Sequence, residues 1–428
     1  MSEHSPLGAS GADRWMQCHG SVGLLEKLGM PESDEEDYQI VGTAMHAAAA
    51  HALTEGLEGW ELTGTEHNGV TMTSDLVVPI DVYLQHVRPL MAACDTYGVE
   101  FKISSPVHPL FFGTADFWGV APGFTKPDKM ALHVIDLKGG IGVMVEVEHN
   151  VQVMYYAFGV IDTLERQRSY VIDDDMEVVL GIVQPRAFHP DGPVRQWPTT
   201  VGYIKQWVHE TLVPHMLATA YDNSLDAGPW CRFCPAKLVC PVLTNLFRAA
   251  CTASPDVAGE LTDDQLGFNY RYADPVKMFV KALEKEAMRR LNAGRPLPWG
   301  DGKHLKLVYM KANRTWKEGA RELAIHRYGA AALEEPLNVI VPDPVSLLAT
   351  WPKLIDHVKS PAQMEKVPEA AEWVKSFAYQ PKGALTVAPP HDPRPAIEVS
   401  RLSEKFAGAL DVSEMLQQSV DALAHPAP

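Results

Sequence analysis

Two neighbouring segments with strand-like patterns carry side chains that could bind a metal ion. In ALHVIDLK, Asp136 and Lys138 stand two residues apart. Because successive side chains of a strand alternate between its faces, their carboxylate and ammonium share one face. Asp116 lies in the preceding segment, FFGTADFWGV. Carboxylates from adjacent strands form a hard oxygen site suited to Mg²⁺ or Mn²⁺, and a lysine beside them can orient a water molecule. These residues indicate metal-assisted hydrolysis of a phosphodiester.

Two further segments carry polar groups that could complete such a site. GTAMHAAAAHALTEG is rich in alanine and predicts a helix, in which His46 offers an imidazole to a divalent ion and His51 is an alternative. Gln152 and Tyr156 are four residues apart in a later predicted helix, so they share a face that could contact a nucleic-acid strand. An aspartate and a lysine two positions apart also occur as an ordinary surface ion pair. The prediction therefore depends on the whole set of residues.

Four of the six cysteines indicate a second metal centre. Cys231, Cys234 and Cys240 form C-x2-C-x5-C in a proline-marked segment, and Cys18 lies far upstream. Together they supply four soft ligands, which suit an iron–sulfur cluster or a structural zinc ion. Separate buried thiols are the other interpretation. Cys251 is close enough to the cluster in sequence to be a rival for Cys240.

The elements that must position these groups alternate in type along the first part of the chain. Helical patterns extend to about residue 58, strand-like segments cover 99–138, a helix begins near 148, a buried strand covers 176–185 and a helix covers 201–220. This order predicts an α/β fold. The length of 428 residues allows two or three domains. We place the first at residues 1–250, closed by the cysteine segment, and an accessory region, mostly helical and rich in proline, at 251–428.

The formal charge of the chain is −17, which excludes a uniform attraction to nucleic acid. A polyanion would have to be held by a local basic surface or by bound cations. Between residues 277 and 317 there are eleven Lys and Arg against three Asp and Glu. The predicted DNA-binding residues in this region are Lys277, Lys281, Lys285, Arg289, Lys306, Lys311 and Arg314. The first four recur at every fourth position of a predicted amphipathic helix. The alternative interpretation is that they form an ordinary solvated face, with ion pairs to Glu284 and Glu286.

Composition excludes several other classes of protein. The apolar share of 46% and the charged share of 21% are those of a globular chain. The sequence lacks a long apolar run for a membrane span, a secretory signal at MSEHSPLGAS and a phosphate-binding loop for an ATP-driven motor. We therefore expect a cytoplasmic protein with reduced cysteines and no membrane association.

The motifs GTAMH, GTAD, IDLKGG and QVMYY resemble, in the same order, those of the RecB-like PD-(D/E)XK nuclease family. The resemblance implies a restriction-endonuclease-like core, with a mixed central sheet flanked by helices. Many members have glutamate where this chain has Asp136, and aspartate keeps the ligand with a shorter reach. The implied roles are metal ligation by His46, Asp116, Asp136 and the Leu137 carbonyl, catalysis by Lys138, and substrate positioning by Gln152 and Tyr156.

The cysteine spacing is similar to that of iron–sulfur members of this family, including the AddB subunit and the CRISPR-adaptation nucleases. In these proteins one cysteine precedes the nuclease core and three follow it, so the resemblance implies a 4Fe–4S cluster that staples the two ends of the core. The cluster ligands would be Cys18, Cys231, Cys234 and Cys240. Structural Zn²⁺ remains the alternative.

The segments LGASGADRWMQCHGS, KLKLVYMKANRTW and PHDPRPAIEVS also resemble phage and prophage members of the family. Phage-encoded members commonly resect double-stranded DNA ends for recombination, beside a single-strand annealing protein. The resemblance therefore implies a DNA exonuclease in a bacterial host cytoplasm with such a partner. A non-catalytic DNA-binding or assembly protein on the same scaffold is the alternative, and a homo-oligomer remains open.

Overall fold

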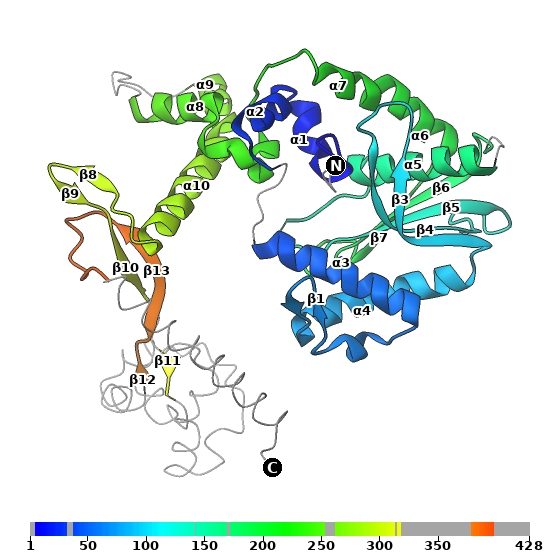
Figure 1. The fold of residues 1–428 in the computed structure, drawn as a ribbon, viewed down its shortest axis with the longest axis horizontal. Coiled ribbons are helices and arrows are strands. Elements are labelled where there is room, and N and C mark those ends of the chain that lie inside the picture. The colour runs from blue at the N-terminus through cyan, green and yellow to red at the C-terminus, as the bar shows by residue number, and fades with distance from the viewer. Residues whose placement is uncertain are drawn as a thin grey trace, which may run out of the picture. The chain divides into compact units, whose positions relative to one another are not determined.

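The computed structural model describes residues 5–31, 37–141, 143–168, 172–252, 262–312, 315–317 and 378–397. The chain divides into two compact units, Met1–Val280 and Lys281–Pro428. This division lies within helix α10 (Ala273–Asn292), downstream of the boundary that composition predicts at residue 250. Figure 1 shows the elements of each unit.

A mixed five-stranded sheet forms the centre of the first unit, with the strand order β3-β4-β5-β6-β7. The strands are β3 (Thr96–Ser104), β4 (Phe112–Pro122), β5 (Met130–Leu137), β6 (Glu177–Val183) and β7 (Val194–Thr200). Strands β5 and β6 are parallel, and the other neighbours are antiparallel. Helix α5 (Val151–Arg168) connects the parallel pair, as such a crossover requires. The predicted α/β class, with a mixed sheet flanked by helices, is confirmed.

Helices cover both faces of this sheet (Figure 1). Helices α3 (Asp37–Glu55) and α4 (Ser74–Ala92) pack on one face, against side chains such as Phe117 and Ile135. On the other face, α5 packs with further helices from both ends of the unit. These are α1 (Ala12–Gln17), α6 (Val201–Trp207), the π-helical turn Val208–Leu212 and α7 (Val213–Ala218). The core is therefore two apolar layers separated by the sheet.

Shorter elements complete the first unit. They are the 3-10 helices Ala9–Gly11, Gly59–Leu62, Pro229–Phe233 and Pro235–Leu238, helices α2 (Gly20–Leu28), α8 (Pro241–Thr252) and α9 (Asp263–Arg271), and the strand pair β1 (Glu66–His67) and β2 (Val70–Thr71). In the part of the chain that the structure describes, no helix is long and apolar enough to cross a membrane.

Among the described residues of the second unit, strands follow helix α10, whereas the sequence predicts a mostly helical extension. After α10 ends, the described residues form antiparallel strand pairs. These pair β8 (Pro298–Gly300) with β9 (Lys303–His304), β10 (Lys306–Lys311) with β13 (Lys382–Ala388), and β11 (Thr315–Trp316) with β12 (Ala378–Tyr379). Valine and tyrosine in β10 favour a strand, and its partner lies far downstream, where local sequence patterns do not reveal the pairing.

Candidate metal centre

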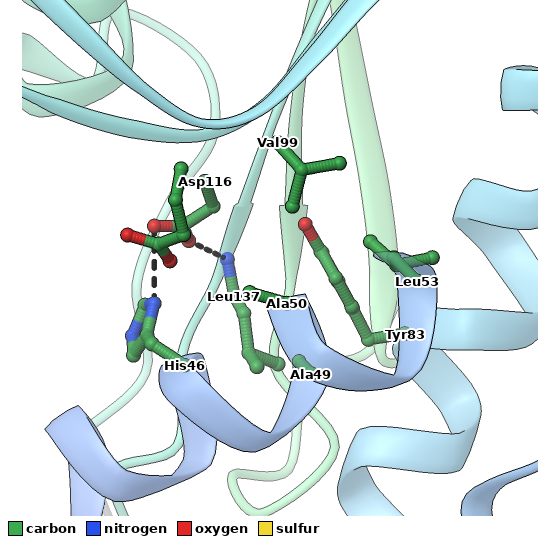
Figure 2. A pocket seen from close by; sticks show the side chains of 9 residues that line it. His46, Ala49, Ala50, Leu53, Tyr83, Val99, Asp116 and Leu137 are labelled. Atoms are coloured by element: carbon green, nitrogen blue, oxygen red, sulfur yellow. Dashed lines mark hydrogen bonds and ion pairs between the residues drawn. The ribbon is translucent and has the colours of Figure 1, made fainter. Parts of the chain in front are cut away.

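His46, Asp116 and Leu137 meet at the C-terminal end of strand β5 in the central sheet (Figure 2). Nδ1 of His46 on α3 lies 3.0 Å from Oδ1 of Asp116 on β4. The other Asp116 oxygen, Oδ2, accepts a hydrogen bond of 2.7 Å from the backbone N–H of Leu137 at the end of β5. His51, the alternative histidine, is exposed, and its ring lies beside that of His67. The structure therefore places His46 at the carboxylates and not His51.

Asp136 and Lys138 begin a chain of polar contacts that leads from the sheet to α5. Nζ of Lys138 lies 2.9 Å from Oδ2 of Asp136 and donates to Oε1 of Gln152 at 2.6 Å. The Gln152 amide in turn donates to the Tyr156 hydroxyl at 3.1 Å. In this arrangement the predicted substrate-positioning pair orients the lysine. Contact of the pair with a nucleic-acid strand stays a prediction.

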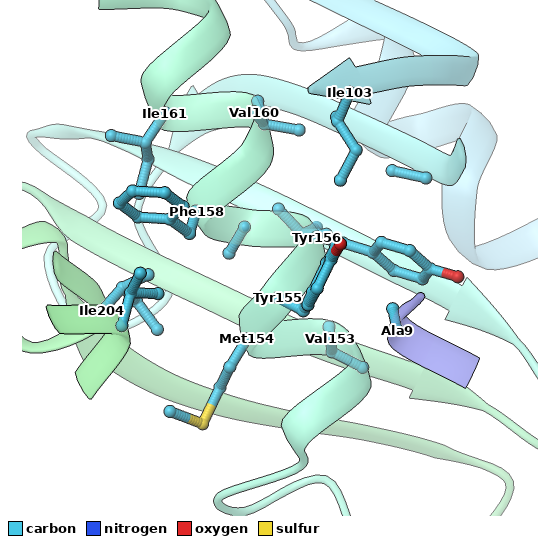
Figure 3. Packing of buried hydrophobic residues seen from close by; sticks show 14 of the residues in the cluster. Ala9, Ile103, Val153, Met154, Tyr155, Tyr156, Phe158, Val160, Ile161 and Ile204 are labelled. Carbon is cyan, nitrogen blue, oxygen red and sulfur yellow. The ribbon is translucent and has the colours of Figure 1, made fainter. Parts of the chain in front are cut away.

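Helix α5 is firmly anchored, which fixes the position of Gln152 and Tyr156. Its buried side chains, including Phe158 and Ile161, form the centre of the larger apolar core (Figure 3). At Gly159 the helix approaches β3 so closely that a β-carbon would lie 2.4 Å from Cδ1 of Ile103. Glycine is therefore needed for this contact, because a larger residue would push the helix away from the sheet.

Asp136 has features that fit a bound cation. The residue is 1% exposed, and its Oδ1 has no hydrogen-bond partner among the described residues. Burial raises the pKa of Asp136, and the neighbouring Asp116 carboxylate raises it further, while the Lys138 ammonium opposes both effects. Leaving a buried acceptor unpaired costs about 1–3 kcal/mol. A divalent ion would satisfy this oxygen and also reduce the repulsion between the two carboxylates.

His46 and Asp116 favour each other's charged form. Burial alone would lower the pKa of His46, but the charge of Asp116, the hydrogen bond to it and the charge of Asp136 raise the value to about 9. Burial likewise would raise the pKa of Asp116, but His46 and the Leu137 amide lower it below its usual value. Without a metal ion, an imidazolium therefore supplies positive charge between the carboxylates.

We expect the affinity for Mn²⁺ to rise with pH, because His46 must lose its proton before it can coordinate an ion. The His46 pKa of about 9 means that this proton is still present at neutral pH. Between about pH 6 and pH 8.5, each pH unit should therefore increase the association constant up to about tenfold. Titration calorimetry at several pH values measures this slope. His46→Ala should bind more weakly and with a shallower slope, and a flat profile for the unchanged protein would contradict ligation by His46.

Glu100 is a residue of this site that the sequence analysis did not identify. It lies on β3, and its carboxylate groups with the ligand atoms of His46 and Asp116, all within 4.8 Å of one another. Burial and the Asp116 charge raise the pKa of Glu100. The pocket around these groups is otherwise lined by Ala49, Ala50, Leu53, Tyr83, Val99 and Leu137 (Figure 2). Glu100 stands in VEFKIS without a motif, so the sequence offers no signal that would mark it.

The four cysteines of the predicted cluster are buried free thiols. Cys18 lies at the C-terminal end of α1, Cys231 and Cys234 lie in or beside the 3-10 helix Pro229–Phe233, and Cys240 directly precedes α8. The backbone N–H of Asp226 donates to Sγ of Cys18 at 3.4 Å, which ties the start of the unit to its cysteine segment. Cys251, the rival ligand, is exposed.

The other three cysteines lie close enough to Cys231 for their charges to affect its thiol. Burial raises the pKa of Cys231 to about 11, and charges on Cys234, Cys18 and Cys240 would each raise it further. Thiols in such surroundings stay protonated at neutral pH unless a metal ion replaces the protons. The four soft donors are therefore suited to bind a metal centre.

The basic residues of α10 have acidic neighbours. The predicted DNA-binding residues on this helix are Lys277, Lys281, Lys285 and Arg289. Arg289 forms an ion pair of 2.7 Å with Glu286, and Lys277 one of 3.3 Å with Asp274. Lys277, Asp274 and Arg289 are exposed and Glu286 is half-buried, so water and salt screen both pairs and a phosphate group could replace the acidic partners. DNA binding by this helix stays a prediction.

The remaining predicted basic residues differ in their surroundings. Nζ of Lys306 donates to the carbonyl oxygens of Asp392 and Arg394, both at 2.7 Å, so its ammonium holds together parts of the second unit. Lys311 is exposed at the end of β10. Arg314 lies outside the described residues.

Comparison with known protein families gives a match over most of this chain. A family model described as "Protein of unknown function (DUF2800)" matches residues 4–395. The matched range includes every residue of the metal site and the four buried cysteines. Since the description assigns no activity, function has to be inferred from the geometry of the site.

Proposed function

The chain belongs to the DUF2800 family, and we propose that it is a divalent-metal-dependent DNA nuclease, an exonuclease that hydrolyses phosphodiester bonds at DNA ends. The proposal rests on one observation, the convergence of all four motifs. The histidine on α3, the aspartate on β4, the Asp-x-Lys segment at the end of β5 and the Gln-x3-Tyr pair on α5 meet beside the C-terminal end of β5. This convergence, in the α/β architecture found, also supports a restriction-endonuclease-like core.

The donor set fits Mg²⁺ or Mn²⁺. The Asp116 and Asp136 carboxylates, the Leu137 carbonyl and the His46 imidazole are ligands that these ions accept, and the unpaired Oδ1 of Asp136 supplies a free lone pair. A bound ion would polarise the scissile phosphate and lower the pKa of the attacking water. A purely structural role explains the site poorly, because burying an unpaired carboxylate oxygen reduces stability.

Lys138 supplies the positive charge that the reaction requires near the phosphate. Its ammonium is held between Asp136 and Gln152, and the side chain is 21% exposed, so it is positioned and still accessible from solvent. An ammonium there can orient the attacking water and stabilise the negative charge that develops on the phosphate oxygens. Tyr156 contributes indirectly, since it fixes the amide of Gln152 that holds the lysine.

For the four buried cysteines we propose a 4Fe–4S cluster, with structural Zn²⁺ as the alternative. Their burial, their free thiols and the bond from Asp226 to Cys18 support a shared metal centre. Such a centre would join α1 to the segment that precedes α8, so its role would be to hold the two ends of the nuclease unit together.

The substrate and the cellular setting follow from the resemblance to phage and prophage nucleases. That resemblance supports DNA ends as the substrate, a bacterial cytoplasm as the location and a single-strand annealing protein as the partner. The net charge of −17 means that DNA must be held locally, and the basic face of α10 is the surface we propose for this role.

Cleavage of labelled DNA tests the proposal. Purified protein should degrade end-labelled linear DNA with Mg²⁺ or Mn²⁺, leave closed circular DNA intact and lose activity in EDTA. Cleavage of the circular DNA would show that the enzyme is an endonuclease and not an exonuclease. DNA binding without cleavage of either substrate by metal-loaded protein would overturn the enzymatic proposal and favour the non-catalytic alternative.

A further inference from the structure

Glu100 belongs to none of the four nuclease motifs, yet it lies at the metal site. Its carboxylate and the ligand atoms of His46 and Asp116 all lie within 4.8 Å of one another. Carboxylate and imidazole groups gathered this closely could hold one metal ion between them. Asp136 lies on the adjacent strand, β5, and its charge acts on both His46 and Glu100.

The strand β3 is irregular at Glu100. Its register with β4 pairs Val99 with Phe117 and Phe101 with Ala115, which places Glu100 opposite Asp116. Glu100 itself has a φ of +46°, the left-handed conformation that residues with a β-carbon rarely adopt. Strained backbone conformations of this kind cluster at functional sites, so the φ value supports a functional role for Glu100.

Both strands change faces at this pair of acids. Ala115 packs into the core under α5, whereas Phe117, two residues later, packs into the core under α3 and α4. In a regular strand residues two apart share one face. Their partners on β3 divide between the two cores in the same way. The irregularity therefore falls on Glu100 and Asp116 together, and both side chains line the same pocket.

The buried Oδ1 of Asp136 is an independent sign of a ligand. It has no hydrogen-bond partner among the described residues, although the side chain is almost completely buried. The site contains three carboxylates, those of Glu100, Asp116 and Asp136, against the ammonium of Lys138. Two of these negative charges are not balanced by the ammonium. A bound phosphodiester and a hydroxide would add two more. Two divalent cations would balance this total.

We propose that Glu100 makes the site a two-cation site. One Mg²⁺ or Mn²⁺ is held by His46, Glu100 and Asp116, and the other by Asp116, Asp136 and the Leu137 carbonyl, with Asp116 shared between them. This inference rests on the proposed nuclease function and divides its ligand set between two ions. Paired ions about 3.5–4 Å apart can stabilise both the attacking and the leaving oxygen of an in-line displacement.

Binding of Mn²⁺ to the full-length protein tests the inference. Titration calorimetry should give two ions per chain, and electron paramagnetic resonance should show the broadened spectrum of a coupled Mn²⁺ pair. Glu100→Gln should keep one ion with an uncoupled spectrum, and Asp136→Asn should do the same. Glu66→Gln, at an exposed strand glutamate on β1, is the matched control and should bind two coupled ions.

A second variant guards against a folding defect at Glu100. Glu100→Asp keeps the charge with a shorter reach, so it should weaken binding of one ion at least about tenfold. One uncoupled ion in the unchanged protein, or a coupled pair in Glu100→Gln, would overturn the two-cation site. In both cases the nuclease proposal would stand as long as the unchanged protein cleaves DNA. Failure to bind Mn²⁺ together with failure to cleave DNA would overturn both.

Discussion

Asp136→Asn should reduce the rate of DNA cleavage by a factor of about a thousand or more, because it removes a charged metal ligand while keeping the size of the side chain. DNA affinity should change little, since Asp136 is buried at the end of β5. Single-turnover cleavage of end-labelled DNA measures the first effect, and fluorescence anisotropy with Ca²⁺ in place of Mg²⁺ measures the second.

The same substitution should make the metal-free protein more stable. Burial raises the pKa of Asp136, so the folded protein favours the protonated carboxyl more than the unfolded chain does. Ionisation therefore destabilises the fold once the pH exceeds the ordinary aspartate value, and an amide removes that cost. Thermal melting in EDTA should show a higher midpoint for Asp136→Asn at pH 7 than for the unchanged protein. Catalytic residues that reduce stability are common in enzymes.

Lys138→Met tests the other half of the same motif. Loss of the ammonium should slow cleavage by a factor of about a hundred to a thousand, because an electrostatic contact to the transition state is removed. Lys102→Met, at an exposed lysine on the neighbouring strand β3, is the matched control and should cleave normally. Undiminished cleavage by either Asp136→Asn or Lys138→Met would rule out the mechanism.

Local patterns were sufficient to predict strands β3, β4, β5 and β6 and helix α5, but not α4 or β7. Helix α4 contains Pro79 and Pro89, which interrupt the pattern of a helix. Strand β7 contains Pro198, which a central strand would not tolerate. It is accommodated because β7 lies at the edge of the sheet and pairs only with β6.

In the candidate site, too, local patterns predict some residues and not others. Asp136 and Lys138 stand two residues apart at the end of one strand-like segment, so their contact could be predicted before the fold was known. Glu100 could not, because its place depends on the register between β3 and β4 and on an irregular backbone. For Lys306, the sequence reveals the charge of the side chain but not its hydrogen-bond partners. Its charge suggests DNA contact, but its bonds to two carbonyl oxygens depend on residues far downstream.

Cys231→Ser should abolish binding of the proposed iron–sulfur cluster and strongly destabilise the first unit. The unchanged protein, purified without air, should be brown, with absorption at about 400 nm and about four iron atoms per chain. Burial raises the pKa of Cys231 to about 11, so this thiol stays neutral at pH 7 without a metal, and no disulfide joins the four free cysteines. Loss of a metal centre that binds only the folded state should lower the melting temperature by about 10 °C or more.

Cys18→Ser should have the same effect, although Cys18 lies 208 positions upstream of its hydrogen-bond partner, Asp226. An equal effect of Cys18→Ser and Cys231→Ser distinguishes a metal centre shared by all four cysteines from one held by the three downstream cysteines alone. If three clustered cysteines alone held the metal, loss of Cys18 would leave iron content unchanged and contradict the staple. Cys251→Ser, at an exposed cysteine on α8, is the matched control and should keep colour, iron and stability. A colourless protein with stoichiometric zinc would replace the cluster by a zinc site. The joining role of Cys18 would still hold, because a tetrahedral zinc site also needs a fourth ligand.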